Sequence, residues 1–119
     1  MSSREASAEL YRHWLELWNG DLGVAEEVAA PAFVGHWPGR PAMVGSRDEL
    51  VAVVEQTRAM FPDLRFAIEL GPLVDGDLVA ARWTGTQAGE HFLSGHDILR
   101  VAGGHLVEYW AMSEDPTSG

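Results

Sequence analysis

The first half of the chain carries its apolar side chains at the spacing of helices. Intervals of three and four residues predict a first helix that ends at Trp18, on a stripe of Leu10, Trp14, Leu17 and Trp18. A short second helix is expected from Asp21 to Val28. A third is expected from Ser46 to Met60, because Ser46 and the glutamate three residues later have the spacing of a capping box. Between the second and third helices, residues 32–37 are typical of a short strand.

The second half of the chain changes to the alternating pattern of a sheet. Four strands are predicted, over residues 65–73, 78–87, 92–101 and 105–113. Asp75-Gly76 and Gly103-Gly104 stand between strands and are typical of tight hairpin turns. Helices followed by an antiparallel meander indicate an α+β fold. We expect three N-terminal helices packed on a curved sheet that encloses either an open cavity or a filled core.

The last hairpin places an aspartate among apolar side chains. With a two-residue turn at Gly103-Gly104, Ala102 pairs with His105, and further along the hairpin Leu99 faces Glu108 and Asp97 faces Trp110. Alternation then gathers one mostly apolar face, which we expect to point inward: Leu93, Asp97, Leu99, Val101, Leu106, Glu108, Trp110 and Met112. Because an unpartnered aspartate is costly to bury, Asp97 is the leading candidate for a functional group.

Two interpretations of Asp97 are open at this point. In the first, burial and the nearby carboxylate of Glu108 raise the pKa of Asp97, which suits a group that exchanges protons with a substrate. In the second, Asp97 is structural: it pairs with an arginine such as Arg82, or the two faces are reversed and it lies in water. Glu108 is expected to be either a pocket residue or an ordinary residue of the strand surface.

Histidine and tryptophan supply the other candidates. His36 ends the short strand where helices and sheet meet, so it is either a donor to a substrate oxygen or an exposed loop histidine. Five tryptophans either wall a site for a flat, apolar ligand or fill the core: Trp14, Trp18, Trp37, Trp83 and Trp110. His96 alternates to the opposite face from Asp97, and His91 is far along the strand, so we expect no metal site.

Composition narrows the classes of partner. A length of 119 residues suits a single domain. The formal net charge of -10 opposes binding to nucleic acid or to an anionic membrane, and no apolar run is long enough to span a bilayer. The chain has no cysteine and no apolar leader at its start, so we expect a cytoplasmic protein whose partner is a small molecule.

Several segments, in this order, resemble one family. The stretch HWLELWNGDLGVAEEVAAPAFVGHWPG is similar to the opening of the SnoaL-like polyketide cyclases, which belong to the nuclear transport factor 2-like superfamily. MFPDLRF, LVAARWTGT and GHDILRVAGGHLVEYW resemble the rest of the pattern. The resemblance covers about residues 8–114 of a single 1–119 domain. It implies a cone-shaped, cystatin-like fold, a curved mixed sheet around a pocket, and a homodimer.

The resemblance also implies a chemistry. Similar proteins close rings by intramolecular aldol condensation without metal or cofactor, and their acid/base aspartate stands in a Gly-x-Asp-x-x-Arg pattern that here contains Asp97. Asp97 then takes a proton from a carbon flanked by carbonyls, and His36 or Gln87 stabilises the oxyanion. Gln87 stands where many relatives carry histidine. The alternatives are a ketosteroid-isomerase-like isomerase, a binding module that shields an apolar metabolite, and a dimeric interaction domain with a filled core.

Overall fold

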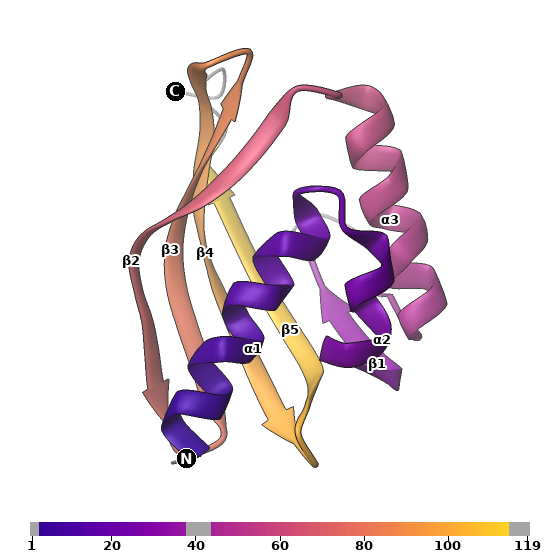
Figure 1. Cartoon of the computed structure of the whole chain (residues 1–119), viewed down its shortest axis with the longest axis vertical. Coiled ribbons are helices and arrows are strands. Elements are labelled where there is room, and N and C mark those ends of the chain that lie inside the picture. The colour runs from indigo at the N-terminus through magenta and orange to yellow at the C-terminus, as the bar shows by residue number, and fades with distance from the viewer. Residues whose placement is uncertain (1–2, 38–43, 115–119) are drawn as a thin grey trace.

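The computed structural model describes residues 3–37 and 44–114, and its elements follow the expected order (Figure 1). The helices are α1 (Ser3–Trp18), the 3₁₀ turn η1 (Leu22–Val24), α2 (Ala25–Val28) and α3 (Arg47–Met60). The strands are β1 (Ala29–His36), β2 (Leu64–Asp75), β3 (Leu78–Gln87), β4 (Glu90–Ala102) and β5 (His105–Glu114). The loop expected after Trp37 lies largely outside the described residues.

Local sequence signals explain most of the helix boundaries. The side chain of Ser46 accepts a hydrogen bond from the backbone N–H of Glu49 at 3.1 Å, which caps α3 as predicted. The expected second helix is a 3₁₀ turn that continues into a single α-helical turn and ends at Val28. Pro31 does not separate that helix from the strand, because β1 already begins at Ala29 and includes it. A proline is tolerated there because β1 is an edge strand, and its register is irregular between Ala29 and Val34.

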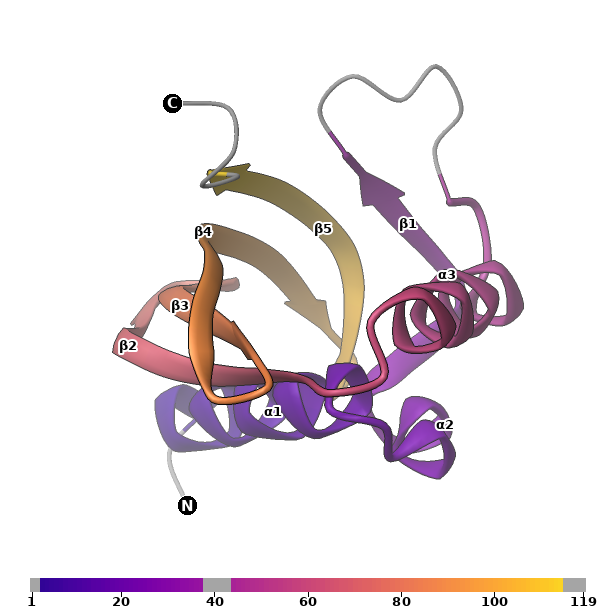
Figure 2. The same cartoon turned by 90° about the horizontal axis from the view of Figure 1, so that it is seen from above.

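The five strands form one mixed sheet in the order β1-β5-β4-β3-β2. β1 runs parallel to β5, and the other neighbouring pairs are antiparallel. Figure 2 shows that the sheet curves and that α1 and α3 lie on the same side of it. This is the α+β architecture predicted from the sequence, with the third helix inserted after the first strand of the chain. No helix in the described ranges has the length and apolarity needed to cross a membrane.

A bulge in the last hairpin corrects the predicted register. Ala102 pairs with His105 as expected, but the register shifts between Arg100 and Val101. Arg100 therefore faces Glu108, which leaves one additional residue, Val107, on β5. Beyond the bulge, Leu99 faces Tyr109 and Asp97 faces Ala111, so the predicted partners of both residues are wrong by one position.

The one-residue shift exchanges the two faces of β5. Tyr109 is buried, at 4% exposure, whereas Met112 is 59% exposed. On β4 the predicted alternation holds, because Asp97 and Leu99 are buried and Ile98 is exposed. The inward face predicted for β5 is therefore wrong for Glu108, Trp110 and Met112, which alternate with Tyr109 onto the outer face of the sheet.

Candidate functional site

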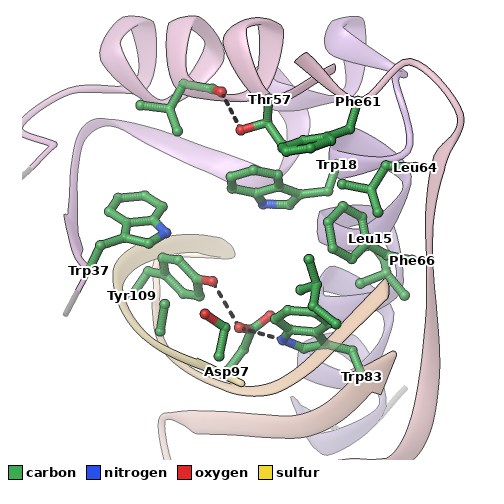
Figure 3. A pocket seen from close by; sticks show the side chains of 14 residues that line it. Leu15, Trp18, Trp37, Thr57, Phe61, Leu64, Phe66, Trp83, Asp97 and Tyr109 are labelled. Carbon is green, nitrogen blue, oxygen red and sulfur yellow. Dashed lines mark hydrogen bonds between the residues drawn. The ribbon is translucent and has the colours of Figure 1, made fainter. Parts of the chain in front are cut away.

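The concave side of the sheet and the helices enclose an apolar cavity of about 240 Å³ (Figure 3). Its lining comes from α1, α3 and the strands β2 to β5, with Trp37 after the end of β1. Most of the wall is aromatic or aliphatic, including the indole rings of Trp18, Trp37 and Trp83 and the rings of Phe61 and Phe66. The open-cavity alternative of the sequence prediction is therefore the one observed.

Asp97 lies in the wall of this cavity and is only 3% exposed. Its Oδ1 atom accepts hydrogen bonds from the Trp83 indole at 2.9 Å and the Tyr109 hydroxyl at 2.8 Å. Its Oδ2 atom accepts from the Tyr11 hydroxyl at 3.0 Å and the Trp14 indole at 3.3 Å. Each oxygen thus receives one phenol and one indole donor, and among the described residues the carboxylate is held by neutral groups alone.

The sequence brings these donors together by simple periodicities. Tyr11 and Trp14 are three residues apart on α1, so both point from the same face of that helix. Trp83 and Tyr109 lie on β3 and β5, the strands on either side of β4. The carboxylate is therefore fixed by one helix and by both strands that flank its own.

Gly95 makes room for this arrangement. An added Cβ at this position would lie 2.6 Å from the Trp83 ring and 2.3 Å from the backbone oxygen of Met112. Because Gly95 is paired with Trp83 across β3 and β4, the missing side chain lets the indole lie against β4 and reach Asp97. This is the physical reason for a glycine two residues before the aspartate in the Gly-x-Asp-x-x-Arg pattern.

Burial controls the electrostatics of the carboxyl group. Removal from water raises the pKa of Asp97 above its ordinary value of 3.8, and the four hydrogen bonds to its carboxylate oppose the rise. Burial and the adjacent Asp97 also raise the pKa of Tyr11 and of Tyr109. Both phenols therefore stay protonated and remain donors near neutral pH.

The structure excludes the arginine pair and the solvent-exposed position that were considered for Asp97. Arg82, the arginine considered as its partner, contacts Glu69 at 3.2 Å and His96 at 3.0 Å instead. Within residues 3–37 and 44–114 no ion pair reaches Asp97. Asp97 is thus buried without a cation beside it in these residues, as the first interpretation expects, and burial raises its pKa. The contribution expected from Glu108 is wrong, because Glu108 lies on the outer face of the sheet with His36 and Arg100.

Three of the predicted site residues lie together on the outer side of the sheet. His36 contacts Glu108 at 2.9 Å through Nε2 and stacks on Trp110 with 5.6 Å between ring centroids. Arg100 also approaches this group, at 3.7 Å from Glu108. None of His36, Glu108 and Trp110 is among the residues that line the cavity, so the structure does not bring them to Asp97.

Two further candidates, Trp14 and Gln87, do not line the cavity. Trp14 is fully buried, and its indole N–H donates a hydrogen bond to Asp97. Gln87 ends β3, and its side-chain oxygen is buried without a hydrogen-bond partner in the described part of the chain. In the same part of the chain, no three His, Asp or Glu side chains come together as metal ligands.

Sequence reasoning missed both tyrosines. Tyr11 could have been found, because it shares a helical face with Trp14, three residues later. Tyr109 could not, because the bulge at Val107 decides its face and no turn or glycine signal marks that position.

Comparison with known proteins finds one matching family model and several solved structures of similar fold. The profile of the SnoaL-like domain matches residues 11–109. None of the curated protein sequences compared with the chain matches it significantly.

Three solved structures are similar to this one over nearly all of both chains. A loop-truncation variant of IdmH is 30% identical, with a TM-score of 0.78, and the match covers 89% of this chain and 91% of that one. Wild-type IdmH, a candidate polyketide cyclase from Streptomyces antibioticus, is 27% identical with a TM-score of 0.76, covering 89% and 90%. A candidate polyketide cyclase from Acidithiobacillus ferrooxidans is 26% identical with a TM-score of 0.75, covering 96% and 92%.

Proposed function

The chain belongs to the SnoaL-like family, and from that premise we propose that it is an enzyme in which Asp97 moves protons on an apolar carbonyl compound. The observation that supports this most is the state of Asp97. The carboxyl group lines an apolar cavity, has a pKa raised by burial, and has no cation beside it in the described ranges. A carboxyl group in these surroundings is suited to take and return a proton near neutral pH.

The proposed reaction is ring closure of a polyketide by intramolecular aldol addition. The Asp97 carboxylate removes a proton from a carbon flanked by two carbonyls, and the C–H electron pair becomes an enolate. The enolate carbon attacks a second carbonyl of the same molecule, so a C–C bond forms and the attacked oxygen becomes an alkoxide. The protonated Asp97 then returns its proton to that alkoxide, and no oxidant, reductant or cofactor takes part.

The cavity walls fit such a substrate. Flat apolar surfaces are offered by the indole rings of Trp18, Trp37 and Trp83. These surfaces hold the substrate chain in a folded, reactive conformation. A substrate bound against this apolar lining displaces water, which strengthens each remaining electrostatic interaction with the developing enolate.

Tyr109 is the donor that we expect to move when the proton is transferred. The four hydrogen bonds occupy all the acceptor positions of the carboxylate, so one of them must open. Tyr109 lines the cavity, and its hydroxyl can rotate to accept a bond from the newly formed carboxylic O–H. An indole N–H can only donate, so Trp83 cannot adapt in this way.

The structure limits the roles of the other candidates. Trp14 acts on the substrate through Asp97, because it contacts the carboxylate and does not line the cavity. The proposal gives no oxyanion role to His36, which is engaged by Glu108, nor to Gln87, whose side chain lies outside the lining. Glu108 and Trp110 have no part in the proposed reaction.

A second candidate function is supported by the saturation of the carboxylate. If none of its four donors releases Asp97, the cavity binds an apolar molecule without changing it. The protein is then a binding module of the same fold.

Deuterium exchange separates the two functions without knowledge of the natural substrate. β-Tetralone is a flat, uncharged ketone with acidic carbon-bound protons, and NMR follows their replacement in D₂O. We expect the protein to accelerate this exchange, and Asp97→Asn to reduce the acceleration by about 10²–10⁴-fold. Glu108→Gln, the same change on the outer face, should leave it intact.

The outcomes of this experiment differ clearly. Exchange that survives Asp97→Asn in a folded protein would reject the enzymatic proposal. Binding of β-tetralone to the wild-type protein without any exchange would favour the binding module.

We also propose that the protein is a homodimer, as the resemblance implies. The outer face of β4 and β5 exposes Ile98 at 44%, which is paired with Trp110, and Met112 at 59%, two residues further along β5. An apolar strip of this kind is suited to pairing with a second copy. Light scattering coupled to size exclusion should give twice the mass of one chain, which is 13.0 kDa. Ile98→Arg should lower the measured mass toward that of a single chain.

A further inference from the structure

Trp18 presents an unused hydrogen-bond donor at the wall of the cavity. It is the last residue of α1 and only 9% exposed, and its ring lies among Trp14, Trp37 and Phe66, with centroids 5.9, 6.4 and 6.1 Å away. Its indole nitrogen is buried and has no hydrogen-bond partner in the described part of the chain. Buried donors without partners are uncommon because they cost free energy, so this one requires an explanation.

The two other indoles at this site have an acceptor for their N–H groups. Trp14 and Trp83 both direct their N–H groups at Asp97. Trp18 lines the same cavity but does not reach the carboxylate. Figure 3 shows its nitrogen on the edge of the ring that is turned toward Asp97.

The neighbouring polar groups do not use this donor. The Thr57 hydroxyl, also in the lining, donates to the backbone oxygen of Val53 at 2.9 Å. Tyr109 and Trp83 are engaged with Asp97. None of these groups accepts a hydrogen bond from Trp18, so a molecule inside the cavity can supply the missing acceptor.

We propose that the indole N–H of Trp18 holds the carbonyl oxygen of the substrate whose neighbouring carbon loses its proton to Asp97. This inference rests on the proposed function of the same cavity and adds to it the position of the substrate's oxygen. As the proton leaves, negative charge grows on that oxygen, and a donor already in place stabilises it. The preferred ligand is an uncharged, planar ketone rather than a hydrocarbon or an anion.

The central test observes the indole proton itself. In a ¹H–¹⁵N spectrum of the wild-type protein, the five tryptophans give five indole signals, and the one lost in Trp18→Phe is that of Trp18. Addition of β-tetralone should move the Trp18 signal downfield, as a new hydrogen bond does. Tetralin has the same ring system without the oxygen and should leave the signal in place or move it upfield by ring current alone.

Affinity supplies a second readout. The preference of the protein for β-tetralone over tetralin should fall by about three- to tenfold in Trp18→Phe, the usual effect of one neutral hydrogen bond. Trp110→Phe is the matched control, because it makes the same change on the outer face and should preserve the preference.

Two results would overturn the inference. One is a Trp18 signal that responds equally to β-tetralone and tetralin or to neither. The other is a ketone preference that persists in Trp18→Phe. Both are distinguishable from failure of the proposed function, because loss of exchange in Asp97→Asn is measured on a different residue and does not depend on the Trp18 signal.

Discussion

Two carboxylates on neighbouring strands of the same sheet are held in opposite ways. Asp97, on the inner face of β4, is 3% exposed and receives four hydrogen bonds from neutral phenols and indoles. Glu108, on the outer face of β5, has a side chain 31% exposed and contacts His36 at 2.9 Å and Arg100 at 3.7 Å. The charge of Asp97 is balanced by dipoles in the interior, whereas Glu108 is held by the imidazole of His36 and the guanidinium of Arg100 at the surface.

This difference separates a reactive carboxyl group from a structural one. Charged partners at the surface are solvated and contribute little, so their loss is tolerated. Neutral donors in the interior allow the carboxyl group to exist in two protonation states. If this acceptor is removed, the buried donors cannot form hydrogen bonds with water instead.

Removal of each carboxylate gives the largest contrast. Asp97→Ala leaves four buried donors without an acceptor. We expect the free energy of unfolding to fall by at least about 3 kcal/mol, because each buried donor without a partner costs about 1–3 kcal/mol. Glu108→Ala should lose less than about 1 kcal/mol. Urea unfolding followed by circular dichroism measures both, and equal losses would refute the contrast.

Exchange of the carboxylate for an amide gives an intermediate effect. Each oxygen of Asp97 faces one indole N–H, so either orientation of an asparagine amide sets its NH₂ group against Trp14 or Trp83. We expect Asp97→Asn to lower the free energy of unfolding by about 1–3 kcal/mol. In a Trp14→Phe background the amide can turn toward the vacant side, where Tyr11 can accept its hydrogen bond.

A double-mutant cycle isolates this conflict. The cost of Asp97→Asn should fall by about 1 kcal/mol when Trp14→Phe is present, within the usual range for residues in contact. Trp110→Phe, on the outer face, serves as the control background and should leave the cost unchanged. An additive cycle with Trp14→Phe would show that no such conflict exists.

The pH dependence of stability tests the raised pKa. Because the pKa of Asp97 is higher in the folded protein than its ordinary value of 3.8, the folded state binds the proton more tightly. The resulting contribution to stability is complete below pH 3.8 and is lost as the pH rises through the folded pKa. The difference in stability between wild type and Asp97→Asn should therefore decline over that interval, and a difference that grows with pH would contradict the assignment.

The outer contacts should give the smallest effect. Glu108→Gln removes the charge that faces His36 and Arg100. We expect the free energy of unfolding to change by less than about 1 kcal/mol, and by less still in high salt. Thermal melting at low and high salt measures it. A loss as large as that of Asp97→Asn would mean that the outer group is part of a stabilising network.

The contrast between the two faces was only half accessible from the sequence. Periodicity predicted the helix stripe with Trp14 and Trp18, and alternation along β4 placed Asp97 inside. The face of β5 was missed because a single extra residue, Val107, reverses the alternation beyond the bulge, and no local signal marks it. Pairing partners such as His36 with Glu108 depend on the parallel register of β1 and β5, residues distant in sequence whose register is set by the folded sheet.

The most direct test of the account is the pKa of Asp97 itself. Titration of the ¹³C signal of its carboxyl carbon, identified by its absence in Asp97→Asn, reports the protonation of this group without any substrate. The account predicts a midpoint above the ordinary value of 3.8, since burial outweighs the four hydrogen bonds. A midpoint at or below 3.8 would show that the phenols and indoles hold Asp97 as a permanent anion, and the proposed proton transfer would be wrong.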